Sequence, residues 1–169
     1  MIKPFSTELN QCVLALAPAH IANALAPSSF AEVLASHSDH PSAIRVWDGL
    51  GDDNIYADAR VNQAFRAWHD ATHLRLGSPF GWDGELAVVN EQCRDLRIHW
   101  PRIPDSIITL LRTDGLDGVA YYRDHASFPI DQRASVLANL GRLTYANFSR
   151  FISSLASRCC AIHALGWNE

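Results

Sequence analysis

Apolar residues that return every three or four positions dominate this chain of 169 residues. The spacing is clear in Thr7–Ala17 and longest after Asp131, where it continues to about His163. Such spacing places apolar side chains on one face of an α-helix. The strict alternation of apolar and polar residues that indicates strands is scarce. The sequence therefore predicts an all-α fold, a single-domain irregular bundle of about six helices over residues 1–169.

Capping and turn residues delimit the expected helices. Ser29 and Glu32 form a capping-box pattern that opens a short helix through about Ala35. Ile44–Trp47 is expected to be a short extended piece within a loop from His37 to Asp53. Gly115 and Gly118 are expected to break or soften the helical stretch in which they lie. The remaining helices are expected over Asp58–Leu74, Glu85–Arg97, Asp105–Arg112 and Val119–His125.

Composition excludes some classes of function. The chain has 14 Lys and Arg against 18 Asp and Glu, and Lys3 is its one lysine. A surface that follows nucleic-acid phosphates needs clustered basic side chains, so we expect no nucleic-acid partner. The cysteines form neither a disulfide framework nor a C-x-x-C pair, which indicates reduced thiols in a cytoplasmic protein. They are Cys12, Cys93, Cys159 and Cys160.

The N-terminal region resembles an export signal only superficially. Leu9–Ala31 contains no Asp, Glu, Lys or Arg, but its apolar stretch Cys12–Ala17 stops at Pro18. A secretory signal has a longer apolar centre, and a membrane span needs about 20 mainly apolar residues. We therefore expect a soluble cytoplasmic protein without a transmembrane segment.

The residues most suited to metal binding or catalysis lie in the helix expected over Asp58–Leu74. His69, Asp70 and His73 form a polar stripe beside the apolar face of that helix. His69 and His73, at positions i and i+4, can offer two ring nitrogens to one metal ion. Asp70 is either another ligand or a partner that orients an imidazole.

Glu85 supplies a carboxylate from the next helix. It follows the loop Gly77–Gly84, which is short enough to return the second helix antiparallel and to bring Glu85 towards the His73 end. Gln92 lies two turns further along the same face, whereas Glu91 points elsewhere. Two histidines with one or two carboxylates suit a divalent zinc ion, and equally a non-haem iron or manganese ion.

The spacing of these residues resembles the metal motif of a known family. His69-Asp70-x-x-His73, eleven further residues and Glu85 read as H-D-x-x-H-x11-E, the pattern of the ubiquinone-biosynthesis protein Coq4. The resemblance implies an α-helical protein in which His69, Asp70, His73 and Glu85 hold a divalent metal. It also implies oxidative decarboxylation at ring carbon one of a quinone precursor, within a membrane-associated complex, and hence an aromatic or quinone-like ligand.

Other classes of protein remain open. A zinc protease would use Asp70 as general base, although its side chain is one methylene shorter than glutamate. In a helical interaction or scaffold protein, the same stripe is a hydrogen-bonded polar cluster. An HD-type phosphohydrolase would combine an upstream histidine, a His-Asp pair and a downstream aspartate, here His40, His69-Asp70 and one of Asp105, Asp114, Asp117 or Asp124.

The first hypothesis is a small metalloprotein that binds one divalent ion through His69, His73 and Glu85. Asp70 is the fourth ligand or an orienting, catalytic group. Open coordination positions would take water or an oxygen-bearing small molecule, in an enzyme of oxidative or hydrolytic type. The long C-terminal apolar pattern could serve a homodimer as readily as a core. Apolar walls would select the substrate, with Phe80, Trp82 and Trp68 as candidates.

Overall fold

The computed structural model describes residues 3–49 and 53–142. The chain divides into two compact units, of which the first ends at Val136 and the second begins at Leu137. Each unit is considered by itself, and the site lies in the first. The expectation of a single domain over 1–169 stays a prediction.

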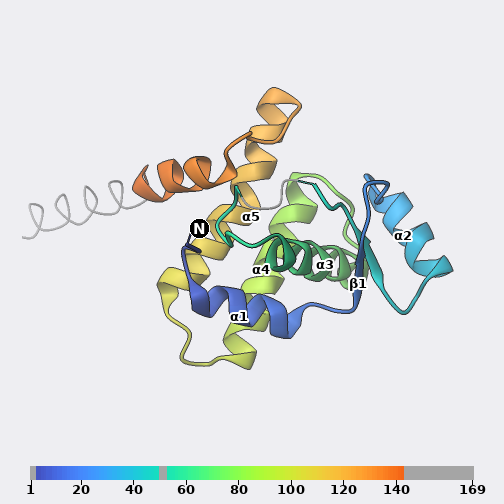
Figure 1. Cartoon of the computed structure of the whole chain (residues 1–169), viewed down its shortest axis with the longest axis horizontal. Helices are drawn as coiled ribbons and strands as arrows, with labels where there is room; N and C mark the ends of the chain where they lie inside the picture. Colours follow the sequence, from blue (N-terminus) through green and yellow to red (C-terminus); the bar gives the residue numbers. More distant parts are fainter. Residues whose placement is uncertain (1–2, 50–52, 143–169) are drawn as a thin grey trace, which may run out of the picture. The chain divides into compact units, whose positions relative to one another are not determined.

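Helices make up most of the first unit, as predicted (Figure 1). A small parallel sheet accompanies them, in which β1 (His20–Ala22) pairs with β2 (Ile44–Val46). Residues 132–136 are also helical, as are residues 137–142 of the second unit. The rest of the pattern expected to reach His163 lies outside the described residues. The helices are α1 (Thr7–Leu16), α2 (Phe30–Asp39), α3 (Ala59–Leu76), α4 (Trp82–His99) and α5 (Asp105–His125).

Side-chain caps start the first three helices. The Ser6 hydroxyl accepts a hydrogen bond from the Leu9 amide at 3.0 Å, and the Asp58 carboxylate caps α3. Ser29 and Glu32 form the predicted capping box at the start of α2. These caps satisfy amides that have no partner within a helix. Local sequence therefore sets where these helices begin.

The structure differs from the expected elements in three ways. Strand β1 was not predicted, since its three residues are too short for a periodic pattern. Helix α2 continues to Asp39, beyond the expected end at Ala35. Helix α5 runs without a break through Gly115 and Gly118. A Cβ atom on Gly115 would lie 2.6 Å from Val89 Cγ2, so the glycine permits close packing against α4.

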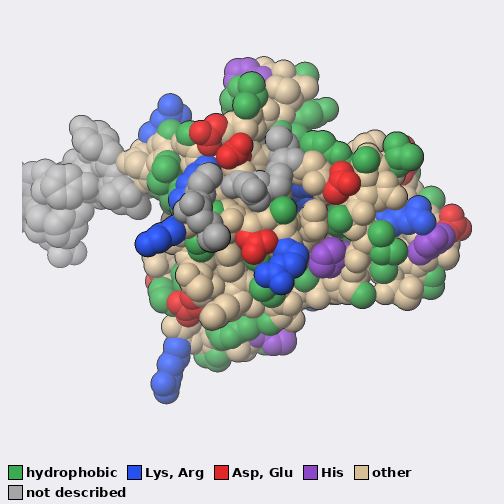
Figure 2. Space-filling model, in the orientation of Figure 1, with side chains coloured by type: hydrophobic (Ala, Val, Ile, Leu, Met, Phe, Trp, Pro, Cys, Tyr) green, Lys and Arg blue, Asp and Glu red, His purple; other side chains and the backbone are tan. Residues whose placement is uncertain are grey.

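Helix α3 is the centre of the first unit, packed against α1, α4 and β2 (Figure 1). Strand β2 packs on it through Ile44 and Val46, which form a buried cluster with Ala67. Elsewhere, basic and acidic side chains are interspersed on the face in Figure 2, and neither sign gathers into one patch there. Other fully buried core residues are Leu9, Val13, Val88, Leu96 and Leu111.

Helices α3 and α4 form an antiparallel hairpin, as predicted from the short loop. Near the turn, His73 of α3 lies opposite Glu85 of α4. Further along, Trp68 donates a hydrogen bond to Asp95 at 3.4 Å. The residue numbers fall on one helix as they rise on the other, which defines the antiparallel arrangement. Polar side chains of the two helices therefore lie opposite each other along the hairpin, His73 opposite Glu85 and Trp68 opposite Asp95.

A left-handed glycine ends α3. Gly77 has φ 61°, and its amide hydrogen-bonds to the carbonyl oxygen of Leu74 at 3.2 Å. The Ser78 amide reaches back to the carbonyl oxygen of His73 at 3.1 Å. This pair of bonds is a Schellman motif, which favours glycine because L-residues with a side chain are strained at this backbone angle. The motif folds the chain back onto His73.

The loop then packs against the first turn of α4 at Gly84. A Cβ atom built on Gly84 would lie 1.8 Å from the carbonyl oxygen of Pro79. No side chain fits there, so the loop backbone rests directly on the helix backbone. Because Glu85 is the next residue, this contact sets the position of its carboxylate.

We expect Gly84→Ala to destabilise the first unit by about 1–3 kcal/mol or more, since the added methyl group forces the loop away from α4. Gly118→Ala is the matched control, because its Cβ would meet Phe128 at 3.4 Å, an ordinary contact. There the change should stabilise the helix by about 0.5–1 kcal/mol. Urea denaturation followed by circular dichroism measures both. Equal stability of Gly84→Ala and the unmodified chain would contradict the close contact at Pro79.

Candidate metal centre

Three of the predicted ligands meet in the α3–α4 hairpin. The Nε2 atom of His69 lies 2.9 Å from Glu85 Oε2, and the Nε2 atom of His73 lies 3.4 Å from the same oxygen. The two Nε2 atoms are 3.1 Å apart. Among the described residues, these three side chains form the one group whose ligand atoms all lie within 4.8 Å of one another. The group could hold a metal ion.

The distances between the three ligand atoms suit a divalent ion. Ligand atoms around a tetrahedral ion, with bonds of about 2.0–2.1 Å, lie about 3.3 Å apart. The observed separations of 2.9, 3.1 and 3.4 Å bracket this value. Two imidazole nitrogens and a carboxylate oxygen form a donor set used by zinc and by non-haem iron or manganese.

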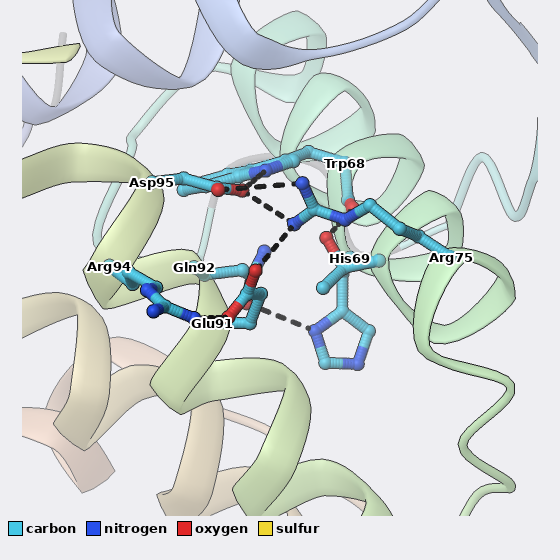
Figure 3. Close-up of polar contacts among 8 residues, drawn as sticks. Trp68, His69, Arg75, Glu91, Gln92, Arg94 and Asp95 are labelled. Atoms are coloured by element: carbon cyan, nitrogen blue, oxygen red, sulfur yellow. Dashed lines mark hydrogen bonds and ion pairs between the residues drawn. The ribbon is translucent and has the colours of Figure 1, made fainter. Parts of the chain in front are cut away.

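Hydrogen bonds on the outer side of each ring orient the histidines. His73 Nδ1 donates to the carbonyl oxygen of Ser78 at 2.7 Å, and a carbonyl oxygen can only accept. His69 Nδ1 faces the amide oxygen of Gln92 at 3.4 Å (Figure 3). A bound ion would keep the ring protons on the Nδ1 atoms and both Nε2 lone pairs directed at the centre. Metal-bound histidines in proteins have this arrangement.

The Ser78 contact depends on the turn. Ser78 donates its amide to the carbonyl of His73 and accepts the ring proton of the same residue. The Schellman motif at Gly77 brings both groups into place. Sequence reasoning missed this role because a backbone carbonyl leaves no residue-type signal. The glycine at the helix end was the available clue.

The charges of the group depend strongly on one another. Burial alone would raise the pKa of Glu85, but its hydrogen bonds to His69 and His73 lower that pKa to about 2. Burial lowers the pKa of His69, and the contact with Glu85 outweighs it, so the pKa is raised. The group therefore favours a carboxylate together with a positive charge between the three side chains.

Solvent reaches the group from the His69 side. The His69 side chain is 17% exposed and the Glu85 side chain 10%, whereas the His73 side chain is fully buried. Any exchangeable ligand would approach along this direction.

Asp70 lies beside the group and is not part of it. Burial raises the pKa of Asp70 to about 6, against the opposing influence of the charges on both histidines. Arg66, one turn earlier on α3, donates to the carbonyl oxygens of Trp47 and Gly49. The predicted role of Asp70 as fourth ligand or catalytic group stays a prediction.

Aromatic rings surround the two histidines. The Phe80 ring centroid lies 4.8 Å from that of His73, and Phe30 lies 6.3 Å from the same ring. Phe65 lies 5.8 Å from His69 and 5.2 Å from Tyr56. Apolar walls of this kind reduce competition by water for the polar centre.

The three residues predicted to form the apolar walls of a substrate site lie in different places. Phe80 contacts His73, as described above. Trp68 is a core residue, 4% exposed, with its indole nitrogen directed to Asp95. Trp82 is 42% exposed, and the Arg123 guanidinium lies 5.6 Å from its ring centroid.

Phe30 was not predicted, because it precedes His73 by more than 40 positions and only the fold brings them together.

Four of the residues that a phosphohydrolase site would combine with His69 and Asp70 have other partners in the described structure. His40 ends α2, where Arg45 donates to its Nε2 at 2.8 Å. Asp105 pairs with Arg97 and Asp124 with Arg123. The hydroxyl of Ser135 donates to Asp117, and none of these residues belongs to the metal-binding group.

Asp114 is a second partly buried carboxylate, on α5. The hydroxyl of Tyr56 donates to it at 3.2 Å. Burial, with a smaller contribution from the charge of Asp117, raises the pKa of Asp114 to about 7, against the opposing influence of the Tyr56 hydrogen bond and the charge of His69. The sequence offered no reason to separate Asp114 from the other aspartates, because its burial depends on the packing of α5.

Comparison with known proteins yields no relative. No family model matches the chain, no curated protein matches it, and no solved structure matches it. Among the described residues, the helices are too short or too polar for any of them to cross a membrane. The geometry of the site is therefore the basis for assigning a function.

We expect Asp114→Asn to stabilise the chain increasingly as the pH rises. A carboxyl whose pKa is about 7 when folded and about 4 when unfolded binds more protons in the folded state between these values. The unmodified chain therefore loses stability as the pH rises from about 4 to 7, whereas asparagine does not titrate. The two chains should be similar near pH 4 and differ by about 2–4 kcal/mol at pH 8.

Chemical denaturation across this range, in metal-free buffer, measures the difference. Asp105→Asn serves as control, because that side chain is 85% exposed and its ion pair with Arg97 lies at the surface. A constant difference between Asp114→Asn and the unmodified chain from pH 4 to 8 would refute the buried acid at this position.

Proposed function

We propose that this chain binds one divalent metal ion through His69, His73 and Glu85 and uses it as an enzyme acting on a small molecule. The observation that carries the proposal is the convergence of three lone-pair atoms at 2.9–3.4 Å. The carbonyl oxygen of Ser78 accepts the Nδ1 proton of His73, and the amide oxygen of Gln92 lies where it can accept the Nδ1 proton of His69. A divalent ion satisfies all three inward lone pairs at once.

Each residue has a distinct role in this proposal. His69 and His73 provide neutral nitrogen ligands, and Glu85 provides a charge that offsets part of the ion's charge. A bound divalent ion would supply Lewis-acid chemistry to an oxygen-bearing ligand. Asp70 lies next to the centre on α3, and we assign to it the transfer of a proton to or from that ligand. The exposed edge of His69 gives the direction of entry.

The substrate class follows from the resemblance to Coq4. The motif His69-Asp70-x-x-His73-x11-Glu85 suggests an aromatic or quinone-like molecule and an oxidative decarboxylation. The rings of Phe80, Phe30 and Phe65 around the histidines support an apolar, aromatic ligand. The donor set is compatible with zinc and with iron or manganese, so the metal is left to experiment.

We expect the purified chain to contain about one zinc, iron or manganese ion per molecule, measured by plasma mass spectrometry. Glu85→Gln and His69→Ala should lower the content to near zero, since each removes a ligand. Adding the metal to the stripped chain at about 100 times its Kd should stabilise the fold by about 2.7 kcal/mol. This corresponds to a rise in Tm of about 5–10 °C.

Glu91→Gln is the matched control, because Glu91 lies on the same helix and faces Arg75 and Arg94 instead of the histidines. It should retain the metal. A chain that stays metal-free and shows no change in Tm after reconstitution with all three metals would reject the enzyme proposal. The cluster would then be a hydrogen-bonded element of a helical interaction protein.

A further inference from the structure

Gln92 is a fully buried polar side chain on the α4 face that meets α3. None of its surface is exposed to solvent. Its amide oxygen lies 3.4 Å from His69 Nδ1, while its Nε2 atom has no hydrogen-bond partner among the described residues (Figure 3). Burying an amide group that is only partly satisfied costs stability, whereas leucine or methionine would fill the same space without that cost. Packing alone therefore does not explain a glutamine here.

Gln92 supplies a hydrogen-bond acceptor for the Nδ1 side of the His69 ring. The Nε2 atom of His69 faces Glu85 and His73, at 2.9 and 3.1 Å, and in the proposed metal site this atom presents a lone pair to the ion. The ring proton must then lie on Nδ1, the atom directed at the amide oxygen of Gln92.

The two histidines are oriented by groups of different kinds. His73 donates to a backbone carbonyl, that of Ser78, which no substitution removes. His69 depends on a side chain, and that side chain lies on the other helix of the hairpin. The ring orientation of His69 is therefore coupled to the packing of α3 against α4.

We propose that Gln92 is a positioning residue that fixes the tautomer and ring orientation of His69 for metal binding. Its amide oxygen accepts the Nδ1 proton and leaves the Nε2 lone pair facing the ion. As a neutral group it does this without adding a second negative charge beside Glu85. The inference rests on the proposed metal function and extends it to a residue outside the ligand motif.

Metal affinity provides the first test. Gln92→Leu and the more nearly isosteric Gln92→Met should weaken the binding of zinc by about 10–100-fold, the range for partners of metal-bound histidines. Gln92→Glu should bind zinc at least as tightly as the unmodified chain, since a carboxylate also accepts the Nδ1 proton. Asn90→Leu, an equivalent change at an exposed position of α4, should have no effect.

The orientation of the His69 ring provides the second test, in the zinc-loaded chain. Long-range ¹⁵N–¹H correlation spectra should show zinc on Nε2 and the ring proton on Nδ1, where the amide oxygen of Gln92 can accept it. Gln92→Leu and Gln92→Met should show a mixture of zinc-bound ring orientations, and Gln92→Glu should restore the single Nδ1-protonated form. Melting of each metal-free variant establishes that it is folded. If leucine perturbs the fold, methionine still tests the role.

The outcomes separate the two proposals. Unchanged zinc affinity and an unchanged His69 tautomer in the folded apolar variants would overturn the role of Gln92. So would a Gln92→Glu variant as weak as Gln92→Leu. If the unmodified chain binds no zinc, the metal function fails and the role of Gln92 fails with it. If the unmodified chain binds zinc and the Gln92 variants bind it equally well, the role of Gln92 alone fails.

Discussion

The convergence of two imidazole nitrogens and one carboxylate oxygen is the constraint on which the candidate site depends. Two imidazole nitrogens and a carboxylate oxygen lie 2.9–3.4 Å apart with little access to water. Such a group needs positive charge among its atoms, either as protons on the imidazole rings or as a metal ion. The three side chains could hold one divalent ion, which would satisfy all three atoms together.

The hairpin of α3 and α4 holds these atoms together through backbone geometry. Gly77 ends α3 in a left-handed conformation, and the turn that follows places the Ser78 carbonyl against His73. Gly84 lets the loop backbone rest on α4, immediately before Glu85. Both glycines are required by geometry, one by its positive φ and the other by a close approach. The short loop between α3 and α4 thus places two ligands, His73 and Glu85, and the Ser78 carbonyl that orients His73.

The sequence predicted much of this centre because helical geometry is local. The spacing of His69 and His73 fixed their common face, and the short loop predicted that Glu85 would return towards them. It could not predict the Ser78 carbonyl, since backbone groups carry no residue identity. Gly115 was expected to break or soften its helix, because the close approach of Val89, which accounts for this glycine, is a tertiary contact that the sequence does not reveal. Helical geometry agrees with the position of Asp70 outside the group, since i and i+1 neighbours on a helix point in different directions.

X-ray absorption spectroscopy of the zinc-loaded chain identifies the atoms that hold the ion. We expect multiple scattering from two imidazole rings, with nitrogen and oxygen ligands at about 2.0–2.2 Å. We expect no sulfur ligand, since Cys12 and Cys93, the free cysteines of the described chain, are not part of the group. A spectrum with only oxygen ligands, as from a hydrated ion, or with sulfur at about 2.3 Å would contradict the proposed site.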